Sequence, residues 1–113
     1  MSAREFLEVL GGKYSLDILE ATGEPRSAQE LSAELDIPTA TCYRRLEAMT
    51  ELGLLEVREG RSEHGRQTDL FRRRIQEINF TMGESTAVTA EERSTASRTV
   101  DRLWSRLRQG ASA

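Results

Sequence analysis

The sequence is short of the side chains that most often carry redox and metal chemistry. Its 113 residues include one cysteine, Cys42, and one histidine, His64. A single cysteine excludes a disulfide within the chain. One cysteine and one histidine also fall short of the four ligands that a structural zinc site uses, so no cofactor is expected.

Long apolar runs are missing as well. No stretch approaches the roughly 20 apolar residues that cross a bilayer, and the N-terminus lacks the basic and apolar segments of a signal peptide. We therefore expect a cytoplasmic protein with no membrane partner. The sequence contains no nucleophile elbow, phosphate-binding loop or metal-ligand spacing, so an enzyme is not expected.

Charge is abundant but unevenly placed. The net charge is −3, from 16 basic and 19 acidic side chains. Residues 1–35 hold three basic and seven acidic side chains, residues 36–75 hold eight arginines and seven acids, and residues 76–113 hold five of each. The acidic sum argues against a nucleic-acid partner, whereas the arginine-rich middle region argues for one.

Two short helices are predicted at the N-terminal end. Ser2 and Glu5 form a capping-box pattern that opens the first, and Gly11-Gly12 ends it. The second is expected over residues 13–22. The spacing predicts that Leu16 and Leu19 share its inner face, with Ile18 to one side.

A helix-turn-helix is predicted over residues 27–52. Ser27 and Glu30 form a second capping box before a brief helix, and Asp36-Ile37 forms the turn. Pro38 then stands near the first position of a longer helix, where its missing N–H costs little. That helix is expected to run to about residue 52 and to stop at the following glycine.

Beyond residue 53 the apolar period changes from helical to alternating. Residues 54–58 read as a half-buried strand, residues 60–67 as a polar hairpin loop, and residues 68–82 as one long strand or two short ones. The parity of the apolar positions flips between Ile75 and Ile78, which predicts a bulge or a break there.

A linker over residues 83–88 and a C-terminal helix over residues 89–113, including a frayed tail, are predicted after the domain at 1–82. Thr89 and Glu92 form the capping pattern of that helix. Its apolar positions are spaced as in a short heptad seam, which predicts a dimerisation helix. The seam consists of Ala96, Val100, Leu103 and Leu107, flanked by Trp104.

The helix after Pro38 has one buried stripe, formed by Cys42, Leu46 and Met49. Its exposed N-terminal half and the following loop offer hydroxyl, aromatic and guanidinium groups that suit base edges and phosphates. Thr41, Tyr43 and Arg44 are expected to read bases, and Arg45, Arg61 and Arg66 to hold phosphates. The full candidate DNA-binding set is Thr39, Ala40, Thr41, Tyr43, Arg44, Arg45, Arg61, His64 and Arg66.

Three segments resemble ArsR-type winged-helix regulators. They are Leu10-Gly-Gly-Lys-Tyr-Ser-Leu-Asp-Ile-Leu19, Ser27-Ala-Gln-Glu-Leu31, and Thr41-Cys-Tyr-Arg-Arg-Leu46 followed by Gly53-Leu54. The resemblance covers roughly residues 6–75. It implies a mainly α fold with a β-hairpin wing (α+β), a winged helix-turn-helix, and a dimeric transcriptional regulator. Metal-sensing members use clustered thiols, which this sequence lacks, so metal sensing is not implied.

The expected function is sequence-specific binding of double-stranded DNA by a homodimer. Its expected interface consists of Phe6, Leu10, Ala96, Val100, Leu103, Trp104 and Leu107. Two alternatives remain open: a winged-helix interaction module of a transcription complex, and a redox switch through Cys42. The extension at 76–82 is open to pairing with a partner subunit or binding an effector. The arginines at 72–74 are open to solvent exposure or DNA backbone contact.

Overall fold

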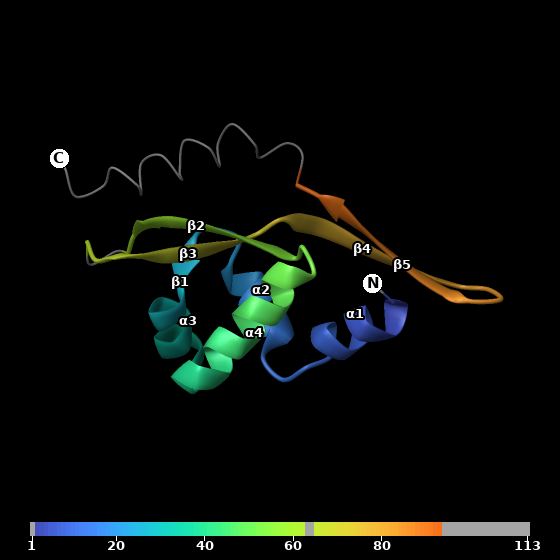
Figure 1. Ribbon diagram of the computed structural model, residues 1–113, viewed down its shortest axis with the longest axis horizontal. Helices are drawn as coiled ribbons and strands as arrows, with labels where there is room; N and C mark the ends of the chain where they lie inside the picture. Colours follow the sequence, from blue (N-terminus) through green and yellow to red (C-terminus); the bar gives the residue numbers. More distant parts are fainter. Residues whose placement is uncertain (1, 63–64, 94–113) are drawn as a thin grey trace.

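The computed structural model describes residues 2–62 and 65–93, and these fold as a winged helix. Apart from one two-residue strand, the helices come first in the chain and the strands follow, as Figure 1 shows. The helices are α1 (Ala3–Leu10), α2 (Ser15–Ala21), α3 (Ala28–Leu35) and α4 (Thr39–Glu51). The strands are β1 (Arg26–Ser27), β2 (Leu55–Arg61), β3 (Gln67–Arg73), β4 (Ile75–Met82) and β5 (Thr86–Glu92).

The wing is the antiparallel hairpin of β2 and β3. The short strand β1 pairs with the other edge of β3, so the sheet has the order β1-β3-β2. In its register Val57 lies opposite Phe71, and α3 and α4 lie against one face of the sheet (Figure 1). The predicted fold class, mainly α with a β-hairpin wing, is confirmed.

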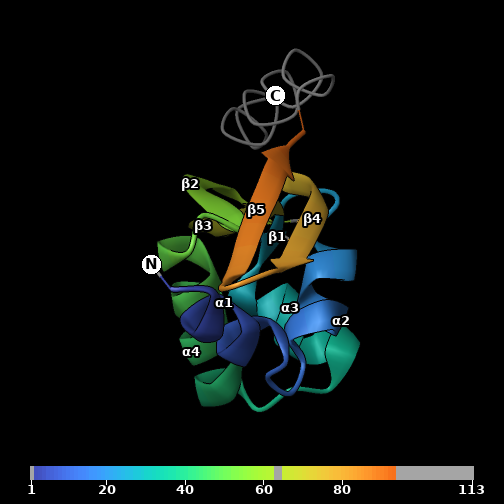
Figure 2. The same cartoon turned by 90° about the vertical axis from the view of Figure 1, so that its right-hand side faces the viewer.

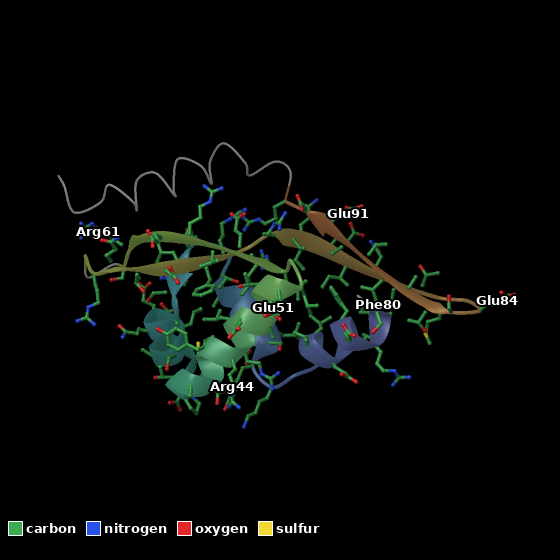
Figure 3. All side chains as sticks on the ribbon, in the orientation of Figure 1. Arg44, Glu51, Arg61, Phe80, Glu84 and Glu91 are labelled. Carbon is green, nitrogen blue, oxygen red and sulfur yellow. The ribbon has the colours of Figure 1, made fainter. Side chains whose placement is uncertain are left out.

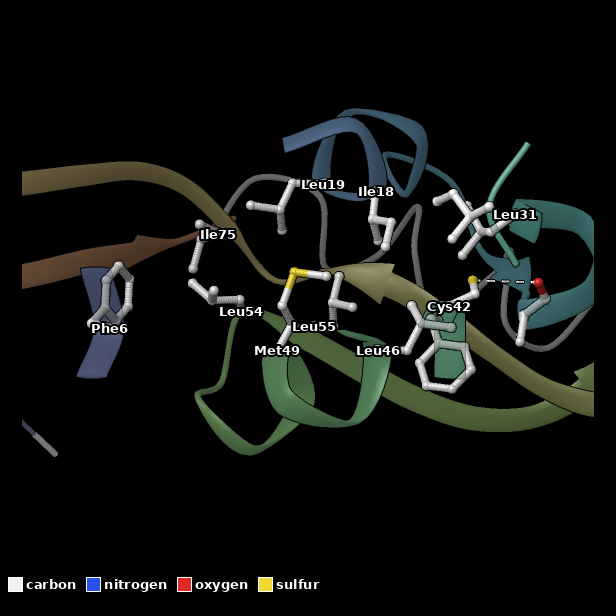
Figure 4. Packing of buried hydrophobic residues seen from close by; sticks show 13 residues of the cluster. Phe6, Ile18, Leu19, Leu31, Cys42, Leu46, Met49, Leu54, Leu55 and Ile75 are labelled. Atoms are coloured by element: carbon white, nitrogen blue, oxygen red, sulfur yellow. Dashed lines mark hydrogen bonds between the residues drawn. The ribbon is translucent and has the colours of Figure 1, made fainter. Parts of the chain in front are cut away.

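The core lies between α2, α3, α4 and the sheet, and α1 contributes one aromatic side chain to it. Leu46 and Met49 of α4 are fully buried against Leu55 of β2, and Phe6 of α1 is buried at the far end (Figure 4). Figure 2, turned by 90°, shows α1 beside α4 and below β5. Burial of such apolar side chains is the main term that stabilises the arrangement.

The first helix begins where the capping pattern predicts. The Ser2 hydroxyl accepts a hydrogen bond from the backbone N–H of Glu5 at 3.2 Å, and Gly11 is the C-cap of α1. The side-chain oxygen thereby satisfies one of the free N–H groups of the first turn.

The inner face of α2 differs from the prediction. Leu16 is 60% exposed, whereas Ile18 is fully buried. The buried face also contains Ser15 and Thr22, whose hydroxyls donate to backbone carbonyl oxygens of Val9 and Ile18, both at 2.7 Å. A buried hydroxyl is tolerated when it is hydrogen-bonded, and a count of apolar spacing alone places such residues outside.

The stop after α4 is a Schellman motif around Gly53. The N–H of Leu54 donates to the Met49 carbonyl at 2.9 Å, and the N–H of Gly53 donates to the Thr50 carbonyl at 3.0 Å. Gly53 has φ +79°, a conformation that costs a residue with a Cβ about 1–2 kcal/mol. The predicted glycine stop is confirmed.

The distal hairpin, formed by β4 and β5, points away from the wing (Figure 1). The strand is interrupted at Arg74, which lies between β3 and β4. The β4–β5 register shifts between Ile75 and Glu77. The predicted irregularity after Ile75 is therefore confirmed, and residues 68–82 divide between two strands.

The structure contradicts the expected linker at 83–88 and the expected helix start at Thr89. Residues 86–92 form β5 and pair with β4 from Met82↔Thr86 to Ile75↔Glu92. The capping pattern of Thr89 and Glu92 is local, and a ladder of backbone hydrogen bonds to a neighbouring strand overrides it. The rest of the expected helix, including the seam, lies outside the described residues.

Candidate nucleic-acid interface

The turn between α3 and α4 is held by hydrogen bonds at both ends. Ser27 and Glu30 form the reciprocal capping box at the start of α3, with bonds of 2.8 and 3.0 Å. At the end of α3, Asp36 adopts φ 54°, and the Ser32 hydroxyl donates to the Ile37 carbonyl. These contacts fix the direction in which α4 leaves α3, so the predicted helix-turn-helix is confirmed as a structural unit.

The inward stripe of α4 is the predicted one. Cys42, Leu46 and Met49 are all fully buried. Because successive residues of a helix are rotated by about 100°, this stripe fixes which side chains face away from the core.

The α4 N-terminal face is the outward surface of the first turns of α4. Thr39, Ala40, Tyr43 and Arg44 are exposed there, and Thr41 and Arg45 are half-buried. Arg44, labelled in Figure 3, projects away from the sheet, and its Nη2 donates to the Thr41 hydroxyl at 3.2 Å. A shallow hollow lined by Thr41, Arg44 and Arg45 lies on this face.

The first turn of α4 has backbone donors to offer an anion. Its N-cap is Pro38, which makes no side-chain capping bond, and its first turn contains no acidic residue. The first N–H groups of a helix lack intrahelical partners and carry partial positive charge. Phosphate groups bind readily at such a helix end.

Arg45 rests on the loop between α1 and α2. A Cβ at Gly12 would lie 2.5 Å from Nη1 of Arg45, which is closer than non-bonded atoms approach. The absence of a side chain at Gly12 therefore makes room for the Arg45 guanidinium. This packing holds a positive charge at the border of the α4 N-terminal face.

The wing turn is closed by its own hydrogen bonds. The N–H of Ser62 donates to the Arg66 carbonyl, and Nη1 of Arg61 donates to the Gly65 carbonyl, both at 2.9 Å. Arg66 is exposed, and Gly65 has φ +77°. Arg61 therefore braces the turn while Arg66 faces solvent. His64, the remaining candidate of the wing, lies outside the described residues.

The arginines at 72–74 make contacts within the fold. Arg72 is only 6% exposed, and its Nε donates to a Glu56 carboxylate oxygen at 3.0 Å. Arg74 is paired with Glu92 at the base of the distal hairpin. Arg72 and Glu56 are direct cross-strand partners, so their side chains meet on one face of the sheet, whereas the pair of Arg74 and Glu92 is exposed.

Arg73 and Arg93 tie the strands to the end of α2. Nη1 of Arg73 donates to the Leu19 carbonyl, and Nη1 of Arg93 donates to the Gly23 carbonyl, both at 2.9 Å. The last carbonyls of a helix lack intrahelical partners and carry partial negative charge, so guanidinium groups stabilise them.

An acidic cleft separates the outer side of α4 from the wing. Its apolar wall includes Tyr43, Val57 and Phe71, and its carboxylates are Glu47, Glu51 and Asp69. None of these three acids is ion-paired with another described residue. Like charges repel at short range, so the cleft disfavours phosphates, which leaves the α4 N-terminal face and the wing tip for contact with an anion.

The environment of the Cys42 thiol disfavours its reaction as a thiolate. The residue is fully buried, its Sγ donates to the Ala28 carbonyl at 3.6 Å, and burial raises the pKa of the thiol above its ordinary value. Within residues 2–62 and 65–93, no group of three or more histidine, cysteine or acidic side chains could hold a metal ion. No helix of that region is long and apolar enough to cross a membrane.

The two described residues of the expected dimer interface point into their own chain. Phe6 is buried in the core, and Leu10 packs against the core while half-buried. The exposed apolar side chain of α1 is Leu7. The other members, Ala96, Val100, Leu103, Trp104 and Leu107, lie outside the described residues.

Two features of this surface were missed from the sequence. The room that Gly12 makes for Arg45 joins residues far apart in the chain, and local spacing carries no sign of it. The sequence indicates part of the acidic cleft, because Glu47 and Glu51 are four residues apart and therefore share one side of a helix.

A comparison with known protein families agrees with this geometry. Residues 10–58 match the family described as a helix-turn-helix domain, from the end of α1 into β2. A search of the curated proteins found no match. Residues 10–58 are thus similar to a helix-turn-helix domain, and they lie within a winged-helix fold.

Proposed function

We propose that the chain is a sequence-specific, DNA-binding transcriptional regulator of the ArsR type, acting as a homodimer in the cytoplasm. The observation that carries this proposal is the α4 N-terminal face. Backbone donors and the exposed side chains of Thr39, Tyr43 and Arg44 lie together there. The same face lacks acidic residues in its first turn.

Different groups would perform different parts of recognition. A recognition helix enters the major groove with its N-terminal residues leading, which presents Thr41, Tyr43 and Arg44 to base edges. Arg45, held against the α1–α2 loop, and Arg66 at the wing tip would contact the flanking phosphates. Arg61 would act there through the wing turn that it braces.

The acidic cleft would contribute to specificity by restricting the approach of DNA. Its carboxylates, from Glu47, Glu51 and Asp69, lie between the recognition helix and the wing. A duplex that slid toward the C-terminal half of α4 would bring its phosphates against them. Repulsion of wrong registers is a general way to gain specificity.

A homodimer would place two recognition helices over two half-sites. Such half-sites stand about 34–36 Å apart, one turn of the DNA helix, or a multiple of it. The predicted seam at Ala96, Val100, Leu103 and Leu107 remains part of this proposal.

Binding of genomic fragments over a series of salt concentrations tests the proposal. We expect tight binding to a subset of fragments, with an affinity that falls as salt rises. Arg44→Ala should weaken binding to those fragments by about 1–3 kcal/mol and leave random DNA little affected. Arg74→Ala, which removes an equal charge from the base of the distal hairpin, is the matched control. Equal losses for both variants would contradict base reading by Arg44.

The acidic cleft also favours a second candidate, an interaction module of a transcription complex without DNA affinity of its own. An apolar wall with three carboxylates that pair with no described residue fits a basic, partly apolar protein segment better than a duplex. The same binding experiment separates the two. Absence of binding to every fragment at low salt would favour the interaction module.

The burial of Cys42 speaks against the third candidate, a redox switch. A protonated, buried thiol reacts slowly because the thiolate is the reactive species. We expect the native protein to resist a soluble thiol reagent and to react fully once unfolded. Rapid modification of the native protein would restore the redox candidate.

A further inference from the structure

The distal hairpin is amphipathic, and its apolar face is only partly covered. Along β4, Ile78, Phe80 and Met82 share one face of the hairpin, and Val88 of β5 lies opposite Phe80. Ile78 and Val88 are half-buried and pack against the core. Phe80 is 44% exposed and Met82 is 84% exposed, so apolar exposure increases toward the tip.

A hollow lies between this face and the first helix. It is lined by Ser2, Ala3, Arg4, Leu7, Glu8 and Thr86. Leu7 is 42% exposed within the molecule. Figure 3 shows Phe80 on the α1 side of the hairpin and Glu84 at its tip, beyond the end of α1. One molecule therefore presents both a largely exposed apolar side chain, Met82, and a hollow of mixed polarity with the exposed Leu7 on its wall.

We propose that this surface is the interface with a second copy of the chain, in which Met82 of each copy enters the hollow of the other. The inference rests on the proposed homodimer and gives it a contact surface among the described residues, in addition to the predicted seam. A two-fold interface is self-complementary: a knob on each subunit meets a hole on the other. Met82 and the hollow lie on the same side of the hairpin, so one two-fold rotation satisfies both contacts.

The hollow is lined by one charge of each sign, Arg4 and Glu8, and Arg4 is the complement of Glu84 at the hairpin tip. Glu84 follows Met82 by two residues, and Arg4 lines the hollow. Neither side chain is ion-paired with a described residue. Seating Met82 in the partner's hollow brings Glu84 toward the partner's Arg4, and the symmetry makes this pair twice. Such pairs fix orientation and exclude wrong partners more than they add affinity.

The hairpin itself has a physical need for such a contact. A two-stranded hairpin is marginally stable in water without a further layer against its apolar face. Here Ile78 and Val88 are half-buried against the core, whereas Phe80 and Met82 remain exposed. A second copy would cover Phe80 and Met82. The wing and the distal hairpin point in opposite directions (Figure 1), so this dimer leaves the α4 N-terminal face open.

Sedimentation of the full chain over a concentration series tests the interface. Met82→Glu places a charge in the partner's hollow at two symmetric sites, so we expect the dissociation constant of the dimer to rise by at least about 100-fold. Thr81→Glu adds the same charge to the opposite face of the hairpin, and the constant should change by less than about threefold. Met82 and Thr81 are both exposed, so both variants should retain the wild-type circular dichroism spectrum.

A charge exchange tests the orientation. Arg4→Glu and Glu84→Arg should each raise the dissociation constant by about 3- to 10-fold, because each sets like charges together at two sites. The double variant should return to within about threefold of the wild-type value. A double variant as weak as the product of the single variants would overturn the proposed pairing.

The outcomes separate this inference from the proposed function. A wild-type dimer that Met82→Glu leaves intact overturns the interface and leaves the homodimer standing. A wild-type chain that stays monomeric at micromolar concentration overturns both the interface and the homodimer. A Met82-dependent dimer that binds no DNA supports the interface and contradicts the regulator.

Discussion

The wing and the distal hairpin are two β-hairpins of similar length with opposite surroundings. The wing shares its sheet with β1 and turns Leu55 and Phe71 into the core. The distal hairpin pairs only with itself among the described strands, and its buried apolar residue is Ile75 at the base. The same element is thus an integral part of the fold in one place and an appendage in the other.

The two tips also differ in charge. The wing tip carries Arg61 and the exposed Arg66, whereas the distal tip carries Glu84. Further along the distal hairpin, Glu77 lies opposite Glu91 on its polar face. A duplex is attracted to the first tip and repelled by the second. The hairpins therefore suit different partners, DNA for the wing and protein for the distal hairpin.

The largest expected contrast concerns one phenylalanine in each hairpin. Phe71→Ala should lower the free energy of unfolding by about 3–5 kcal/mol, since the ring is 8% exposed and its removal leaves a cavity. Phe80→Ala removes a ring that is 44% exposed, and should cost less than about 1.5 kcal/mol in the monomer. Urea unfolding at several protein concentrations measures both. Similar costs at low concentration would show that the distal hairpin is as firmly held as the wing.

This contrast also explains how far the sequence predicts the structure. In the region 27–61, local signals and tertiary contacts agree. The capping box at Ser27, the stripe of Cys42, Leu46 and Met49, and the stop at Gly53 all appear as predicted. Each is a short-range pattern that the core then reinforces.

Beyond residue 82 the local signals and the tertiary contacts disagree. Thr89 and Glu92 have the spacing of a helix cap, yet both lie in β5 because β4 supplies a pairing edge. The partner strand is distant information that a capping pattern does not contain. The roles of the arginines at 72–74 were missed for a similar reason, since their acceptors come from β2, α2 and β5.

Among the candidate interface residues, those placed by helical periodicity were predicted, and those placed by tertiary contacts were not. Exposure of Thr39, Tyr43 and Arg44 follows from helical periodicity, and the structure agrees. The support of Arg45 by Gly12 depends on how α1 and α4 meet in space. Phe6, expected at an interface, is buried because α1 turns that ring into its own core. Periodicity identifies the apolar side of a helix but not what will cover it.

A smaller contrast lies in the glycines of the two turns. Gly65 in the wing turn has φ +77°, so Gly65→Ala should lower the free energy of unfolding by about 1–2 kcal/mol. Gly83, at the tip of the distal hairpin, has no atom within 4 Å of a new Cβ and does not adopt a positive φ. Gly83→Ala should therefore change stability by less than about 0.5 kcal/mol. Thermal unfolding of both variants, with the wild type, measures the difference. An equal loss at both glycines would contradict the contrast between the turns.

The smallest effect concerns the charge at each tip, and it separates the two proposed partners. Arg66→Ala should reduce the slope of log affinity against log salt by about 1, since the exposed guanidinium would neutralise one phosphate. Glu84→Ala removes a charge of the opposite sign at the distal tip and should leave that slope unchanged within error. Arg61 is unsuited to this test because its loss would also release the wing turn that it braces. Fluorescence anisotropy with one labelled duplex over a salt series provides the slopes. If the slope for Glu84→Ala moved as much as that for Arg66→Ala, the distal hairpin would itself lie close to DNA, and the division of partners between the two hairpins would fail.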